Sequence, residues 1–137
     1  MAEKKRILII DDSADFVRMN TIALESAGFE VEAAYNAEEG FTKVEYGQPA
    51  AIVLDLMMER HDSGFTLAKK LKTHPIYRQI PILMLTAVGQ ATGFRFSMEK
   101  DGYWMKADDF ADKPLPPGEL VERIQRLIAE SEAVGKP

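Results

Sequence analysis

The sequence predicts an α/β domain built around a parallel β-sheet, and two observations support this fold class. Short apolar runs alternate along the chain with stretches in which apolar residues recur at helical spacing. Several of the short runs are apolar throughout, as is typical of central strands that are covered by helices on both faces of a sheet. We therefore expect strand and helix to alternate from the N-terminus to the C-terminus.

The expected strands are short and evenly distributed along the chain. Continuous apolar runs at 6–10 (RILII), 50–54 (AAIVL) and 81–85 (PILML) predict the central strands. The run at 30–34 (EVEAA) is more polar, and a weaker run at 108–112 (DDFAD) is expected to form the last strand.

The stretches between these runs carry the signals of helices. Gly28 is expected to stop the first helix, Asn36 and Glu39 form a capping box at the start of the next, and Pro116 and Pro117 lead into the last. Apolar residues recur at helical spacing in four sets: Phe16, Met19, Ala23 and Ala27; Phe41 and Val44; Leu67, Ala68 and Leu71; and Leu120, Val121, Ile124, Leu127 and Ile128.

Length and composition are those of one globular domain. The chain has 137 residues, of which 46% are hydrophobic and 28% are charged. We find no internal repeat or linker, and expect a single domain over 1–137 with a core of 5–131 and a flexible C-terminal tail.

Charge and residue usage exclude several classes of function. The formal net charge is −5 and no basic block is present, which argues against direct nucleic-acid binding. The absence of cysteine removes disulfides, thiolate zinc sites and cysteine nucleophiles. No apolar run is long enough for a signal peptide or a membrane span, so we expect a soluble, cytoplasmic domain with no membrane partner.

Acidic and phosphate-binding residue types follow the predicted strands. Asp11 and Asp12 follow the first run, Asp55 the third, Thr86 the fourth and Lys113 the fifth. Because the carboxyl ends of parallel strands meet at one edge of the sheet, these side chains are expected to converge there.

This group of residue types indicates a metal-assisted phosphoryl site. Three clustered carboxylates would repel one another unless a cation joined them, and a set of oxygen ligands suits a hard cation such as Mg²⁺. A lysine and a hydroxyl can bind the oxygens of a phosphoryl group. A carboxylate is also a competent nucleophile that forms an aspartyl phosphate.

The motifs DD (11–12), DLMM (55–58), LTA (85–87) and DKP (112–114) resemble those of the receiver domain of bacterial response regulators, as in chemotaxis regulators, over essentially the whole chain. The resemblance implies a flavodoxin-like three-layer sandwich with strand order 2-1-3-4-5 and about five helices. It also implies a two-component or phosphorelay function, with a sensor histidine kinase or histidine phosphotransfer protein as donor and an effector protein downstream.

The resemblance also implies roles for the metal-binding residues. Asp55 would accept the phosphoryl group. Asp12, Asp55 and the backbone carbonyl of Met57 would bind Mg²⁺, or alternatively Mn²⁺, while Asp11 would act largely through water. Such a domain catalyses its own phosphorylation and dephosphorylation and is not an enzyme acting on a separate substrate.

The residues on the later strands are expected to contact the phosphoryl group and to report its presence. By the same resemblance, Thr86 and Lys113 would contact the phosphoryl oxygens, and Thr86 and Phe110 would form the conformational switch.

The chain departs from the family pattern in three places. The loop after Asp55 (DLMMERHDSGF) is longer and more polar than usual, and Phe110 lacks the hydroxyl of the commoner tyrosine. The segment between Thr86 and Lys113 is longer than usual and contains several glycines, so we expect an atypical fourth helix. Aromatic residues in the segment Gly89–Lys106 make it a candidate homodimer surface.

Each motif taken alone has an ordinary structural explanation. Asp12 would serve as a helix N-cap, Asp55 as a solvated strand end, Lys113 as a surface lysine and Phe110 as a core residue. Three other functions compete with this interpretation. A flavodoxin-like FMN carrier would have a Ser/Thr/Gly-rich phosphate loop after the first strand, which this chain lacks. A haloacid-dehalogenase-type phosphohydrolase requires a second aspartate two positions after its nucleophile, and a degenerate receiver acting only as a binding module would be expected to have lost an acid or the lysine.

Overall fold

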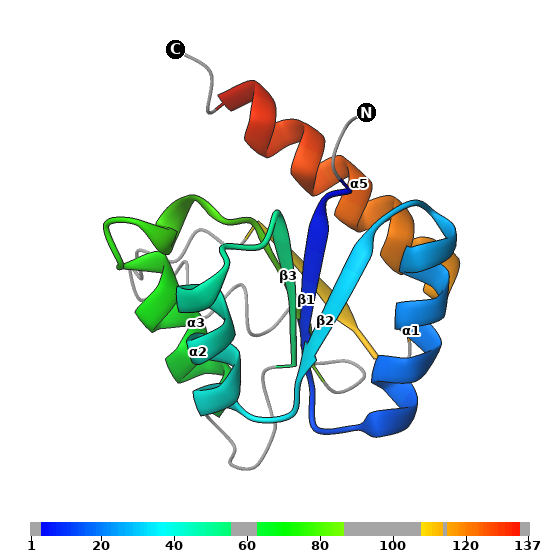
Figure 1. The fold of residues 1–137 in the computed structure, drawn as a ribbon, viewed down its shortest axis with the longest axis horizontal. Helices are drawn as coiled ribbons and strands as arrows, with labels where there is room; N and C mark the ends of the chain where they lie inside the picture. The colour runs from blue at the N-terminus through cyan, green and yellow to red at the C-terminus, as the bar shows by residue number, and fades with distance from the viewer. Residues whose placement is uncertain (1–3, 56–62, 87–107, 114, 135–137) are drawn as a thin grey trace.

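The computed structural model describes residues 4–55, 63–86, 108–113 and 115–134, which form a five-stranded parallel sheet in the order β2-β1-β3-β4-β5 (Figure 1). This order confirms the predicted fold class. The elements are β1 (Arg6–Ile10), α1 (Ala14–Ser26), β2 (Glu30–Ala34), α2 (Ala37–Tyr46), β3 (Ala51–Asp55), α3 (Ser63–Lys72), a 3-10 turn (Tyr77–Gln79), β4 (Ile82–Thr86), β5 (Asp109–Asp112) and α5 (Pro117–Val134).

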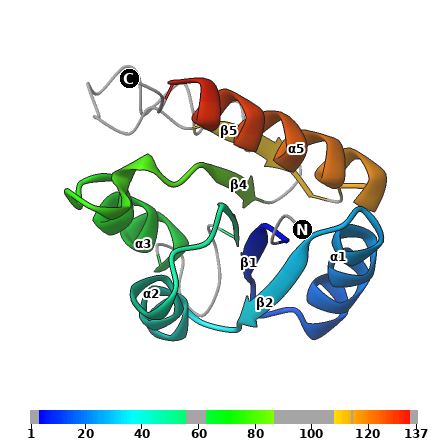
Figure 2. The ribbon, with the colours of Figure 1, turned by 45° about the horizontal axis from the view of Figure 1, so that its top comes forward.

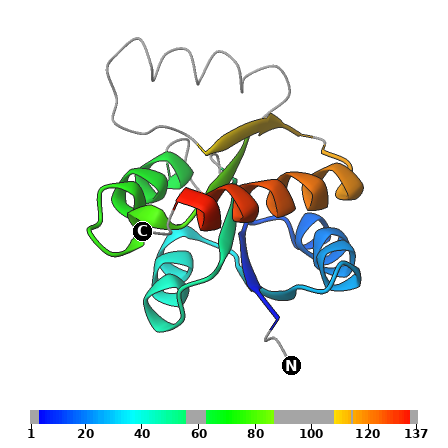
Figure 3. The same ribbon diagram turned by 90° about the horizontal axis from the view of Figure 1, so that it is seen from above.

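The described helices form layers on the two faces of the sheet. Helices α2 and α3 cover one face, while α1 and α5 lie together on the other (Figures 1 and 2). Figure 3, viewed from above, shows α5 running across the sheet from an N-terminal end that lies near α1. Each layer has its own apolar cluster, and the central strands contribute alternate residues to the two clusters, as a strand buried on both faces requires.

The predicted helix signals are present at the observed helix ends. The N–H of Glu39 donates to the Asn36 side chain at 2.8 Å, which confirms this cap, and Gly28 has a φ of 99° after α1. The N-cap of α1 is Ser13, whose hydroxyl accepts from the Phe16 N–H at 3.2 Å. The interpretation of Asp12 as the cap of this helix is therefore wrong.

Two strands lie one residue later than predicted. The run 50–54 becomes β3 (Ala51–Asp55), and 81–85 becomes β4 (Ile82–Thr86). Pro81 has no N–H to donate to the sheet, so β4 begins one residue after it. The Pro81 carbonyl still accepts a hydrogen bond from the Ile52 N–H. As a consequence, Asp55 and Thr86 are the last residues of their strands.

The segment expected to contain the atypical fourth helix (residues 87–107) lies outside the described residues, as do the loop 56–62 and the C-terminal residues 135–137. Among the described residues, no helix is both long and apolar enough to cross a membrane.

Asn20 is a buried polar side chain whose hydrogen-bonding groups are only partly satisfied by the described residues. Asn20 in α1 is fully buried, and its amide N–H donates to the Phe16 carbonyl at 2.9 Å. Its Oδ1 atom has no hydrogen-bond partner within the described part of the chain. An unsatisfied buried acceptor destabilises the folded state by about 1–3 kcal/mol.

We predict that Asn20→Leu raises the free energy of unfolding by about 1 kcal/mol, because leucine has a similar branched shape and no acceptor to desolvate. Urea denaturation measures the change. Asn20→Asp, which buries a charge at the same position, should have the opposite effect. A less stable leucine variant would mean that the amide makes a net favourable contribution.

Candidate functional site

Three aspartates lie together at the carboxyl edge of the sheet, where the parallel strands end. Asp11 and Asp12 directly follow β1, and Asp55 ends β3. These strands are neighbours in parallel register, with Ile10 opposite Leu54, so the residues after them are brought together. One carboxylate oxygen from each of the three acids lies within 4.8 Å of the others. The predicted convergence of the acids is therefore observed.

The three acids differ in exposure. Asp11 is 1% exposed and Asp55 is 6% exposed, whereas Asp12 is open to solvent. The cluster therefore has two buried carboxylates and one that is exposed to solvent.

Lys113 reaches the same cluster from the end of β5. Its Nζ lies 2.7 Å from Asp11 Oδ2 and 3.5 Å from Asp55 Oδ2. Because β4 separates β5 from β3, only a long side chain reaches these acids from β5. The ammonium group offsets part of the repulsion among the carboxylates.

Asp11 also fixes the turn between β1 and α1. Its Oδ1 accepts from the Ser13 N–H at 2.9 Å, and its own N–H donates to the Ala34 carbonyl at 3.0 Å. Since its Oδ2 accepts from Lys113 as well, both oxygens of this buried carboxylate are engaged. Asp11 therefore ties together three elements: β2, the start of α1 and the end of β5.

The donor set fits a hard divalent cation. Three carboxylates and one ammonium leave a negative excess within the cluster, and all the available donors are oxygens. Oxygen ligands of this kind suit Mg²⁺ or Mn²⁺ better than a thiophilic metal.

The other predicted site residues are only partly described. Thr86 ends β4 at the same edge, opposite Asp112 of β5. Met57, predicted to offer its carbonyl to the metal, and the Gly89–Lys106 segment, predicted as a dimer surface, lie outside the described residues.

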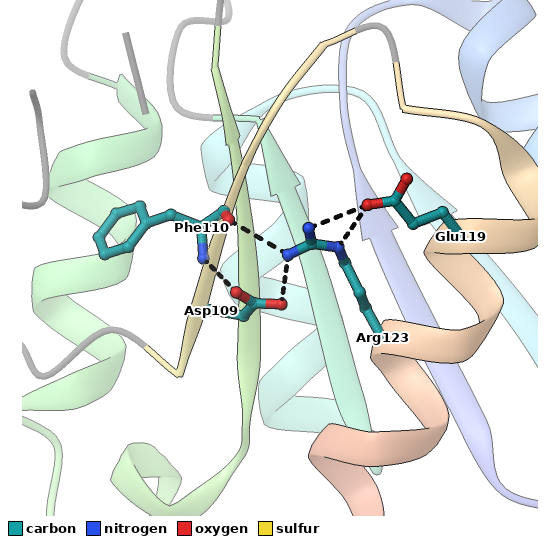
Figure 4. A network of polar contacts seen from close by, with 4 residues as sticks. All are labelled: Asp109, Phe110, Glu119 and Arg123. Atoms are coloured by element: carbon teal, nitrogen blue, oxygen red, sulfur yellow. Dashed lines mark hydrogen bonds and ion pairs between the residues drawn. The ribbon is translucent and has the colours of Figure 1, made fainter. Parts of the chain in front are cut away.

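Phe110, the predicted switch residue, is buried in β5 at 8% exposure within the cluster on the α2–α3 side of the sheet. Its backbone is held on the opposite side. The Phe110 N–H donates to Asp109 Oδ1 at 2.9 Å, and its carbonyl accepts from Arg123 Nη1 at 3.3 Å (Figure 4). Figure 4 shows the ring pointing away from the guanidinium group.

Arg123 of α5 organises this network. It binds Asp109 Oδ2 at 2.8 Å and Glu119 Oε2 at 2.9 Å (Figure 4). Burial disfavours its charge, but the hydrogen bonds and charges of Asp109 and Glu119 outweigh this effect and raise the pKa of Arg123 above its ordinary value. The sequence analysis missed Arg123, although its i,i+4 spacing from Glu119 was an available signal.

Phe16 is a second residue that the sequence analysis did not assign to the site. It was expected only as part of the apolar stripe of α1. Its ring lies beneath Lys113, with Nζ 4.4 Å from the ring centroid. An ammonium within about 6 Å of a ring centroid makes a cation–π contact.

Comparison with known proteins accounts for this arrangement. The family described as "Response regulator receiver domain" matches residues 7–125. The chain belongs to the response regulator receiver family. The observed strand order and the acid cluster are those that the resemblance of the sequence to receiver domains implied.

Individual receivers and regulators are similar over most of the chain. The phosphate regulon transcriptional regulatory protein PhoB of Pseudomonas aeruginosa is 37% identical over 90% of this chain and 52% of its own length. The transcriptional regulatory protein SrrA of Staphylococcus aureus is 35% identical over 93% of this chain and 49% of its own length. The chain therefore spans about half the length of these curated relatives.

One similar solved structure matches the chain over nearly the full length of both proteins. A CheY-like response regulator receiver domain protein from Methanospirillum hungatei superposes with a TM-score of 0.81 at 29% identity, covering 97% of this chain and 100% of that one. The chain is thus a receiver domain of two-component signalling.

We predict that Asp12→Ala raises the melting temperature in the absence of divalent cations, because it removes one of three mutually repelling carboxylates. Ser13→Ala should instead lower the free energy of unfolding by about 1 kcal/mol, since it removes the N-cap of α1. Thermal unfolding in a chelator compares the two variants. A destabilised Asp12→Ala protein would show that the acid supports the turn more than it strains the cluster.

Arg123→Ala should destabilise the fold by about 1–2 kcal/mol, because it removes hydrogen bonds between charged groups and leaves Asp109 without this cation. Hydrogen exchange of the β5 amides should also become faster. Arg126→Ala is the control, since Arg126 is exposed on the same helix. Equal effects of the two substitutions would contradict a specific role for Arg123.

Proposed function

We propose that Asp55 is the phosphoacceptor of this receiver domain and that Asp11, Asp12 and Asp55, with the Met57 carbonyl, hold a divalent cation beside it. The observation that carries the proposal is the geometry of the acids, whose ligand oxygens lie within 4.8 Å of one another, with Lys113 in contact with two of them. This combination serves both needs of phosphoryl transfer, which are a nucleophile and positive charge for the phosphoryl oxygens.

Placement favours Asp55 over its neighbours as the nucleophile. Asp11 holds the β1–α1 turn with one oxygen and Lys113 with the other. Asp12 is exposed and precedes the helix cap. Asp55 ends β3, every residue of which is buried, so the strand holds its carboxylate in a fixed position.

In the proposed reaction, a carboxylate oxygen of Asp55 attacks the phosphorus atom of the donor. The new P–O bond forms as the bond between phosphorus and the leaving group breaks, and the electron pair of that bond departs with the leaving group. The leaving group is an imidazole nitrogen of a phosphohistidine donor or the carboxylate of a small acyl phosphate. The domain itself provides the catalytic groups, so the small donor needs no kinase.

Lys113 and Thr86 are the proposed contacts of the transferred group. The Lys113 ammonium lies 3.5 Å from an Asp55 oxygen, and this contact supports a role in binding the incoming phosphoryl oxygens. Thr86 ends β4, the strand next to β3, and its hydroxyl would donate to another of those oxygens. A bound Mg²⁺ or Mn²⁺ would supply further positive charge to the phosphoryl oxygens.

We propose a sensor histidine kinase or a histidine phosphotransfer protein as donor, in the cytoplasm, and a downstream effector protein as the target. Phosphorylation would draw Thr86 toward the phosphoryl group, and Phe110 would respond by changing its packing. The Gly89–Lys106 segment is the proposed surface for a partner or a second copy.

Wild-type protein incubated with acetyl phosphate and Mg²⁺ should gain the mass of one labile phosphoryl group, and Asp55→Asn should gain none because the amide is not a nucleophile. Removing Mg²⁺ with a chelator should abolish the gain. Asp15→Asn, which alters an exposed acid in the first turn of α1, is the control and should react like wild type.

Intact-mass spectrometry and peptide mapping decide between the possible outcomes. Phosphate incorporation into Asp55→Asn at the wild-type rate would show that the nucleophile is another residue. A folded wild-type protein that gains no phosphate would instead favour the degenerate receiver that acts only through binding.

A further inference from the structure

The Lys113 ammonium has three described contacts, and they differ in kind. Two are carboxylate oxygens, of Asp11 at 2.7 Å and Asp55 at 3.5 Å. The third is the face of the Phe16 ring, whose centroid is 4.4 Å from Nζ. The lysine side chain is 26% exposed, so protein surrounds most of it.

The backbone of Phe16 is fixed at both of its polar groups. Its N–H donates to the Ser13 hydroxyl at 3.2 Å, and its carbonyl accepts from the buried Asn20 amide at 2.9 Å. The ring packs against the apolar cluster between the sheet and helices α1 and α5. The helix therefore presents the ring to Lys113 from a defined position, and does not leave it free to turn into solvent.

The acids and the ring respond differently when the site is used. Both carboxylates that hold Lys113 belong to the cluster that fits a divalent cation, and Asp55 is also the proposed nucleophile. A divalent cation at these oxygens weakens their attraction for the ammonium. The ring is not a ligand for a hard cation, so its contact with Lys113 persists.

We propose that Phe16 is a positioning residue for phosphoryl transfer, and that its ring keeps the Lys113 ammonium over the site when the acids are engaged. This inference rests on the proposed function at Asp55. Phe16 touches neither donor nor metal, and it acts through Lys113 by the attraction of an ammonium to the negative face of an aromatic ring.

Fluorination provides the sharpest test because it changes the ring electrostatics and nearly preserves the ring shape. The chain has seven phenylalanines, so pentafluorophenylalanine is introduced site-specifically at position 16. We expect the rate constant for phosphorylation by acetyl phosphate with Mg²⁺ to fall about 3- to 10-fold, the factor that corresponds to loss of a partly buried cation–π contact. An unchanged rate in the fluorinated protein would overturn the proposal.

Leucine substitutions separate positioning from packing. Phe16→Leu should lower the rate constant to a similar extent, and Phe16→Trp, which keeps an aromatic face, should restore much of it. Phe29→Leu is the matched control, because Phe29 packs against the same apolar cluster but follows α1 at its far end. If Phe29→Leu slowed the reaction as much as Phe16→Leu, the effect would come from stability and the proposal would fail.

A second measurement is independent of phosphorylation. Protons held over the face of an aromatic ring resonate upfield, so the Lys113 ε-methylene protons should move downfield in Phe16→Leu and stay in place in Phe29→Leu. An unshifted Lys113 signal in Phe16→Leu would show that the contact is absent in solution. If wild-type protein gains no phosphate at Asp55, the proposed function fails. If every Phe16 variant is phosphorylated at the wild-type rate, only the role of the Phe16 ring is refuted and the proposed function stands.

Discussion

The gathering of like charges at the end of a buried sheet is the constraint on which the site depends. Strands β1 and β3 are neighbours in fixed register, so the acids that follow β1 lie beside the acid that ends β3. Residues 7–10 of β1 and every residue of β3 are almost completely excluded from solvent, and this rigid framework holds the carboxylates together against their repulsion. The same repulsion makes the cluster receptive to positive charge.

Lys113 and Asp11 show how the fold manages this charge. Asp11 is buried, and a buried carboxylate requires hydrogen bonds or a counter-charge, which it receives from the Ser13 N–H and from Lys113. The contacts that stabilise this acid also set the direction in which α1 leaves the sheet. Asp11 therefore contributes both to the charge balance of the site and to the turn that precedes α1.

Apolar periodicity was sufficient to predict the parallel sheet, and the residues that directly follow the strands predicted the meeting of the acids. The strand order was implied only by the resemblance to receiver domains. The sequence was less informative about where strands end. Strands β3 and β4 each lie one residue later than predicted, and Pro81 precedes β4 because it has no N–H to donate. Arg123 and Phe16 were missed for another reason. Their roles depend on contacts with Asp109 and Lys113, which are close in space but not recognisable from the helical pattern alone.

Phe110 has its two halves anchored in different layers of the molecule. Its ring lies in the α2–α3 cluster, whereas its carbonyl is bound by Arg123 on the α5 side (Figure 4). Rotation of the ring about its side-chain bonds does not require the strand to move. The hydrogen bond from Arg123 to the Phe110 carbonyl holds the main chain in place. Under the proposed switch at Phe110, a change in ring packing would be directed into the α2–α3 layer, while the Arg123 contact would keep the main chain of β5 in place.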